Sequence, residues 1–184
     1  MFGEIERSEK YPDFYKMPEG PGHYFARESA GRLYGLPFLI VFLMELSWKW
    51  RQQHPKFPFG IGDIAAEDGD LIADRPHHSS GMAVDIAVIH CDGVQSVDAF
   101  RWLTWMDDDY DLERTKDLAA TITELGTRFQ ISEFIYNDPK VKPVKKTWPL
   151  ISPRQGHDDH FHLTLSGRHP YTDEQMQEIF PEEG

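Results

Sequence analysis

Residues 82–90, MAVDIAVIH, form an almost entirely apolar stretch in which Asp85 is the single acidic residue. A short, continuous apolar run of this length is typical of a strand that is buried on both faces. A carboxylate inside such a strand is costly unless a cation or hydrogen-bond donors meet it. The stretch therefore predicts a central strand and, at Asp85, a polar site within the interior.

The segments around this strand predict helices and strands that do not alternate regularly. Apolar residues dominate Pro37–Gln53, which favours a largely buried helix with Trp48 and Trp50 in the core. A second helix is predicted over Leu112–Leu125, with Gly126 as its C-cap. Further strands are predicted at Phe59–Ile64, Ile131–Tyr136 and His160–Leu165. This order indicates an α+β fold with a small, mainly antiparallel sheet flanked by helices and long loops.

The length of 184 residues suits one compact domain. Residues 1–22 contain three prolines and three glycines, which predict an irregular N-terminal arm, and residues 23–184 are expected to form a single domain. The single cysteine, Cys91, cannot form an internal disulfide, and nothing around it marks a reactive thiol.

The charge of the chain excludes several kinds of partner. Its formal net charge of −12 is unsuited to nucleic acid and would be repelled by anionic lipids. The longest apolar stretch, Leu36–Met44, is too short to span a bilayer. Charges occur throughout the first twenty residues, so a standard secretory signal is not expected there.

Histidines and aspartates gather in two short segments. The first holds His78 and Asp85, and the second has His160 and His162 two residues apart. In a strand, this spacing puts both histidines on one face and the alternating apolar residues from Phe161 onward on the other. Imidazole and carboxylate are zinc ligands, and three protein ligands with an open position are typical of catalytic zinc. The spacing leaves open whether both histidines bind the metal or one of them transfers protons.

Other polar residues near these segments have two interpretations each. Arg75 could clamp a substrate carboxylate or pair with its neighbour Asp74. Asp158 could orient a histidine or be a solvated loop charge, and we expect the solvated role for Asp159. No glutamate is close in sequence to the second segment, which disfavours a glutamate-based metalloprotease scheme. Surface or packing roles are expected for four further histidines, His23, His54, His90 and His169. Trp102, Trp105 and Trp148 could line a groove for glycan or peptide, although aromatic residues at this density are more often in the core.

The arrangement of His78, Gly81 and Asp85, followed far downstream by His160 and His162, resembles the LAS metallopeptidases, and most of all the penicillin-insensitive murein endopeptidases. Further motifs occur in the order seen in that family. They are Tyr34-Gly35, Gln53-His54-Pro55, Ile61-Gly62-Asp63-Ile64 and Ile135-Tyr136-Asn137-Asp138-Pro139. The resemblance covers roughly residues 24–166 and implies a LAS/hedgehog-like peptidase core.

By this resemblance, one Zn²⁺ per chain is held by His78, Asp85 and His162. His160 is implied as the catalytic histidine, with His157 as a further active-site histidine. The implied activity is hydrolysis of peptide cross-links in bacterial peptidoglycan, including the D-alanyl-diaminopimelate bond. Alternatives that keep the zinc are a D,D-carboxypeptidase or dipeptidase, an L-Ala-D-Glu peptidase, and a non-catalytic cell-wall-binding module.

The expected partners are peptidoglycan stem peptides in the periplasm or cell wall. The murein endopeptidases are exported and disulfide-bonded, whereas this chain has one cysteine. Delivery is therefore expected through phage lysis or through a secretion apparatus. Alternatively, an export segment has been trimmed from the chain. If the protein is a secreted toxin, an immunity protein is a further expected partner.

Overall fold

The computed structural model describes residues 1–26, 31–69, 76–93, 101–141 and 151–181. Its main sheet has five strands in the order β2-β4-β5-β7-β6. These strands are β2 (His23–Phe25), β4 (Phe59–Ile61), β5 (Ala83–Ala87), β7 (His160–Leu165) and β6 (Ile131–Ile135). Only the β2–β4 pair is parallel among these neighbours, so the predicted α+β class with a mainly antiparallel sheet is confirmed.

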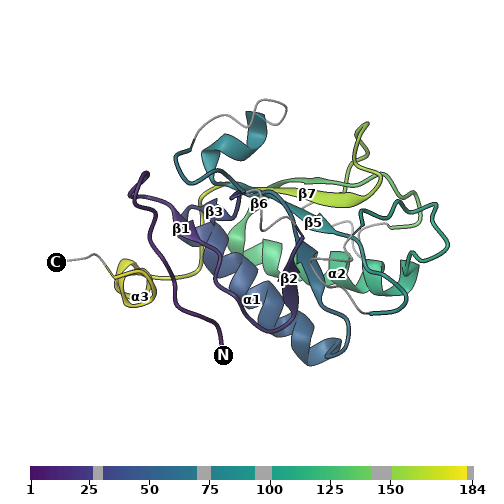
Figure 1. Cartoon of the computed structure of the whole chain (residues 1–184), viewed down its shortest axis with the longest axis horizontal. Helices are drawn as coiled ribbons and strands as arrows, with labels where there is room; N and C mark the ends of the chain where they lie inside the picture. Colours follow the sequence, from purple (N-terminus) through teal and green to yellow (C-terminus); the bar gives the residue numbers. More distant parts are fainter. Residues whose placement is uncertain (27–30, 70–75, 94–100, 142–150, 182–184) are drawn as a thin grey trace.

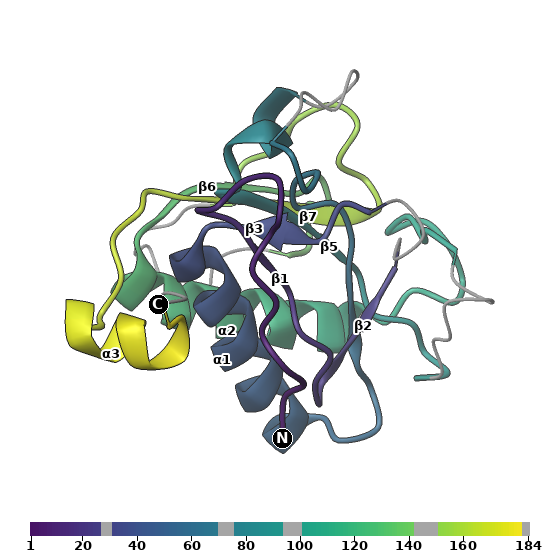
Figure 2. The same ribbon diagram turned by 60° about the vertical axis from the view of Figure 1, so that its left-hand side comes forward.

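Two long helices cover one face of this sheet (Figures 1 and 2). They are α1 (Pro37–Gln53) and α2 (Leu112–Phe129), which pack against each other. The apolar side chains of β7 face this layer, where Phe161, Leu163 and Leu165 are at most 1% exposed. Phe161 packs edge-on against Phe134 and Tyr136 of the neighbouring segment. The core therefore lies between the helices and the sheet, as the strand alternation predicts.

Helix α1 begins and ends at the predicted residues, but its two tryptophans differ. Trp50 is fully buried and its indole N–H donates to the Phe57 carbonyl, whereas Trp48 is 51% exposed. Each residue turns an α-helix by about 100°, so Trp48 and Trp50, which are two positions apart, point about 200° away from each other around the helix axis. The expectation that both tryptophans pack in the core is therefore wrong for Trp48.

Helix α2 begins as predicted and ends later. Asp111 caps its N-terminus by accepting a hydrogen bond from the Arg114 backbone N–H. Gly126 is buried inside the helix, and the left-handed residue that ends it is Gln130, at φ 50°. The predicted C-cap is therefore wrong. Helical packing continues because Phe129 lies against Phe42 of α1, with 5.4 Å between ring centroids.

The remaining elements are short. β1 (Tyr15–Lys16) lies within the predicted N-terminal arm and pairs with β3 (Tyr34–Gly35). The 3₁₀ helix η2 (Pro76–Ser80) stands on the side of the sheet away from α1 and α2. The C-terminal helix α3 (Asp173–Ile179) lies near the N-terminal arm, where Phe180 packs against Tyr15.

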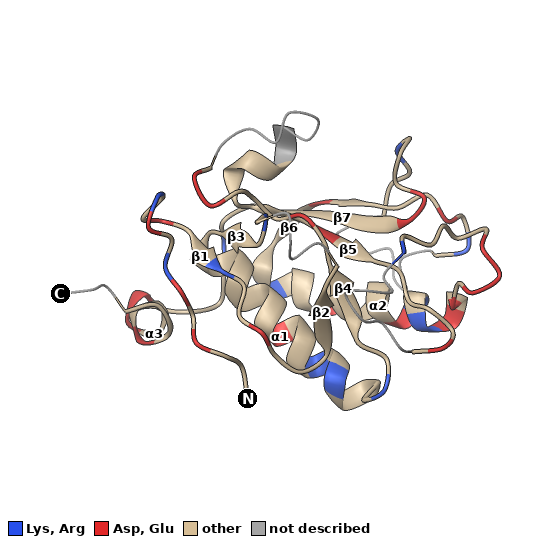
Figure 3. Ribbon diagram, viewed as in Figure 1, with Lys and Arg blue, Asp and Glu red and all other residues tan. Residues whose placement is uncertain are grey.

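Charged residues occur mainly on loops and helices (Figure 3). Asp85 of β5 is an exception, because it lies within the sheet and is only 1% exposed. Among the described residues, no helix is both long enough and apolar enough to cross a membrane.

Candidate metal centre

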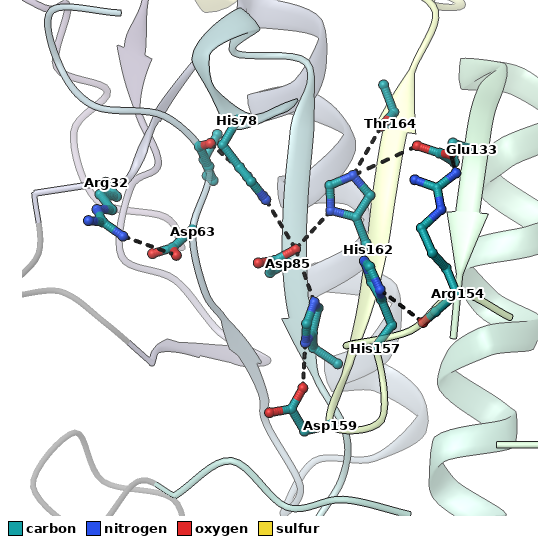
Figure 4. Close-up of polar contacts among 12 residues, drawn as sticks. Arg32, Asp63, His78, Asp85, Glu133, Arg154, His157, Asp159, His162 and Thr164 are labelled. Atoms are coloured by element: carbon teal, nitrogen blue, oxygen red, sulfur yellow. Dashed lines mark hydrogen bonds and ion pairs between the residues drawn. The ribbon is translucent and has the colours of Figure 1, made fainter. Parts of the chain in front are cut away.

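Three side chains that could hold a metal ion meet on the sheet face opposite the long helices. His78, Asp85 and His162 are all buried, and one ligand atom from each lies within 4.8 Å of the others. Register places Asp85 directly across from His162 in the β5–β7 pair. The Asp85 Oδ1 atom is 2.9 Å from His162 Nδ1 and 3.3 Å from His78 Nε2 (Figure 4). Ligands bound tetrahedrally at about 2.1 Å stand about 3.4 Å apart, so one ion fits this spacing.

His78 reaches Asp85 because the chain turns sharply between η2 and β5. Gly81 adopts φ 64°, in the left-handed region that favours glycine, and a Cβ there would lie 2.6 Å from the Phe14 ring. The imidazole of His78 is fixed from behind, where its Nδ1 lies 2.9 Å from the Ile64 carbonyl oxygen. A carbonyl oxygen only accepts hydrogen bonds, so Nδ1 carries the proton and Nε2 of the neutral ring presents a lone pair to Asp85.

Each of the other two imidazoles near Asp85 also turns one ring nitrogen toward the carboxylate and the other away from it. His160 Nε2 is 3.5 Å from Asp85 Oδ1, while its Nδ1 is 2.5 Å from the Asp159 carboxylate. His162 turns Nδ1 inward, and its outer Nε2 lies 3.4 Å from the Thr164 hydroxyl oxygen. Each ring therefore has an acceptor or a hydroxyl on its outer nitrogen and the Asp85 carboxylate on its inner one.

Such an arrangement calls for positive charge at its centre. Neutral rings of this tautomer would aim lone pairs at a carboxylate, and three adjacent imidazolium rings would repel one another. One divalent cation held by Asp85, His78 and His162 relieves both conflicts, so this donor set fits a metal ion. Burial raises the pKa of the Asp85 carboxyl, but the adjacent His162, His78 and His160 together outweigh burial and hold that pKa well below its usual range. The carboxylate is therefore ionised and available as a ligand.

His157 completes the histidine cluster at its outer side. Its ring centroid is 5.0 Å from that of His160 and 5.7 Å from that of His162. The His157 Nδ1 atom is 3.2 Å from the backbone carbonyl oxygens of both Arg154 and Gln155. Burial lowers the pKa of His157, and the nearby His160 lowers it further.

Two carboxylates at the site correct the sequence expectations. Glu133 of β6 brings Oε2 to 4.0 Å from His162 Nε2, so a glutamate does lie near the second segment in space. It pairs with Arg154, which shares its carboxylate. Asp159 is not a solvated loop charge, because it binds His160 directly. Sequence proximity does not indicate Glu133, because it lies 29 residues before His162 on another strand.

Two of the tryptophans also lie at the site. Trp102 packs edge-on with His160, with 5.7 Å between ring centroids, and Trp105 donates its indole N–H to Asp158 at 3.3 Å.

Asp63 is buried and pairs with Arg32, while its backbone carbonyl accepts a hydrogen bond from the Asp85 N–H. The predicted substrate-binding residue Arg75 and the tryptophan Trp148 lie outside the described residues.

No protein-family model matches this sequence, and no curated protein is detectably similar to it.

Proposed function

We propose that the protein is a zinc-dependent endopeptidase that hydrolyses peptide cross-links of bacterial peptidoglycan, with a LAS-like core. The observation that carries this proposal is the convergence of three imidazole nitrogens on one oxygen of buried Asp85. His78, Asp85 and His162 would hold the zinc. Three protein ligands leave a position open, which distinguishes catalytic zinc sites from structural sites closed by four protein ligands.

A zinc ion bound there would polarise the scissile carbonyl and lower the pKa of a coordinated water toward ~7. His160 acts beside it as the proton-transfer group. Its Nε2 lone pair accepts a proton from the attacking water and returns that proton to the leaving amine. His157 is the second histidine within reach of the same space and is the alternative proton carrier.

Burial of the site supports hydrolysis of a neutral amide. The side chains of His78, His160 and His162 are between 3% and 8% exposed, so few water molecules surround the charges. Electrostatic stabilisation is stronger where water is excluded. We place the protein in the periplasm or cell wall during action, with stem peptides as substrates. An immunity protein would be an additional partner if the enzyme is a delivered toxin.

The test uses purified zinc-loaded protein and cross-linked dimeric muropeptides. We expect dimers to become monomers, a chelator to stop the reaction, and β-lactams to leave it unchanged, since no serine nucleophile takes part. His78→Ala, Asp85→Ala and His162→Ala should each lose zinc together with activity, with His169→Ala as a matched control outside the cluster. His160→Ala should retain zinc and lose roughly two to four orders of magnitude in turnover.

Two results would replace the proposal. If dimers persist while monomers lose a terminal D-alanine, the enzyme is a carboxypeptidase. If the protein binds zinc stoichiometrically and converts no muropeptide, the domain is a binding module. Full zinc occupancy in two of the three ligand variants would contradict the metal assignment itself.

A further inference from the structure

The ring of His160 lies between two carboxylates, one of which is closer to the ring than the other. Its Nδ1 lies 2.5 Å from Asp159 Oδ1, and its Nε2 lies 3.5 Å from Asp85 Oδ1. Figure 4 shows Asp159 and Asp85 at opposite ends of this arrangement. A neutral imidazole has one N–H, which it can donate from only one of its two nitrogens. The contact at 2.5 Å is a short hydrogen bond and the contact at 3.5 Å is at the limit of one, so the proton resides on Nδ1.

We propose that Asp159 is a positioning residue that keeps His160 in the tautomer able to accept a proton at Nε2. This inference rests on the proposed function, in which Nε2 of His160 takes a proton from water. Without the Asp159 carboxylate, no hydrogen bond within the described part of the chain would favour Nδ1 as the position of the ring proton. A larger fraction of the rings would then carry the proton on Nε2, and those rings could not act as a base toward the centre of the site.

The position of Asp159 is fixed by the residue before it. The backbone carbonyl of Asp158 accepts from the Trp105 N–H at 3.1 Å, and Asp158 Oδ1 accepts from Trp105 Nε1 and Asn137 Nδ2. These bonds join the segment before β7 to two other loops. The adjacent aspartates thus have different tasks, since Asp158 anchors the backbone while Asp159 binds the imidazole.

Two neighbouring rings pack against the His160 ring. Trp102 meets it at an interplanar angle of 69°, and the His157 ring lies 5.0 Å away at 42°. Rotation of the ring to exchange its two nitrogens would disturb both neighbours. Because the ring keeps this orientation, Nδ1 stays beside Asp159, and the short contact with the Asp159 carboxylate determines that Nδ1 carries the proton.

The test compares Asp159→Ala, which removes the acceptor, with Asp159→Asn, which retains an acceptor oxygen. In zinc-loaded protein, nitrogen-15 NMR should show wild-type His160 protonated on Nδ1 alone, with an increased Nε2–H fraction in Asp159→Ala. Turnover should fall about 10- to 100-fold in Asp159→Ala with KM and zinc content unchanged, the usual effect of losing a carboxylate that orients a histidine. Asp159→Asn should recover part of the loss, and exposed Asp173→Ala is the matched control.

A wild-type His160 protonated on Nε2 would overturn the inference, as would normal turnover in Asp159→Ala. A fall in turnover accompanied by zinc loss or a higher KM would assign Asp159 a purely structural role and also overturn it. The NMR measurement is independent of hydrolysis. If the wild-type protein cleaves no muropeptide, the proposed function fails, and the tautomer still decides whether Asp159 controls the His160 proton.

Discussion

Replacing Gly62 with alanine adds one methyl group where β4 leads into the site. The new Cβ would lie 2.9 Å from Trp102 Cη2, 3.1 Å from the Asp85 carbonyl oxygen and 3.3 Å from Asp85 Cβ. The β5 backbone is held here, because Asp85 O accepts from the Gly62 N–H at 2.7 Å and Asp85 N–H donates to Asp63. Trp102 must therefore give way, by about 0.6 Å to reach the about 3.5 Å of an ordinary carbon contact.

Overpacking of this kind costs about 1–3 kcal/mol of unfolding free energy. Chemical denaturation of zinc-loaded protein measures it, with Gly3→Ala as the control, since a Cβ there meets nothing nearer than 3.6 Å. The clash with Trp102 should disappear in a Trp102→Ala background, giving a coupling energy of at least about 0.5 kcal/mol. If Gly62→Ala lowers the unfolding free energy equally with and without the Trp102 ring, the steric argument is refuted.

Three further predictions concern the core, the outer contacts of the site and acid stability. Phe161→Ala should cost about 3–5 kcal/mol by urea denaturation, because the ring is fully buried between two aromatic neighbours; a loss below about 1 kcal/mol would contradict this. Glu133→Gln should weaken zinc binding about tenfold in a chelator competition, because Glu133 faces the outer nitrogen of His162; unchanged affinity would show that Thr164 alone orients the ring. Burial lowers the pKa of His23 from 6.5 to about 4 in the folded protein. Above pH 6.5 the neutral ring leaves the unfolding free energy unaffected, and as the pH falls from 6.5 toward 4 the unfolded chain takes up the proton first, so the unfolding free energy decreases. His23→Phe should therefore remove about 3 kcal/mol of acid sensitivity between those pH values, measured as unfolding free energy against pH, and an unchanged pH slope would reject this origin.

The elements with strong periodic patterns could be predicted from the sequence. Pro37–Gln53 and His160–Leu165 are observed at the predicted bounds, since each carries its own boundary signals or strict alternation. The predicted ligands His78, Asp85 and His162 come together because the β5–β7 register follows from burying one face of each strand. Local patterns thus determine both the strands and the side of the sheet on which the polar residues gather.

Features that depend on tertiary packing could not be predicted. Gly126 has the residue type of a C-cap, but the contact of Phe129 with Phe42 extends α2 beyond it. Glu133 reaches the site only because β6 pairs with β7, and no local pattern around it indicates this. The role of Asp159 depended on a choice between two adjacent aspartates that the sequence cannot distinguish.

The pairing of Asp85 with His162 joins positions that are 77 residues apart in the chain. A metal ion held by both residues is therefore a cross-link that closes a long loop, in a protein whose single cysteine allows no internal disulfide. Closing such a loop reduces the conformational freedom of the unfolded chain, as a disulfide would. Unlike a disulfide, this link can be opened by a chelator or by acid without any redox reaction. Zinc content and resistance to unfolding should accordingly rise and fall together, so metal supply would set how long the folded protein persists.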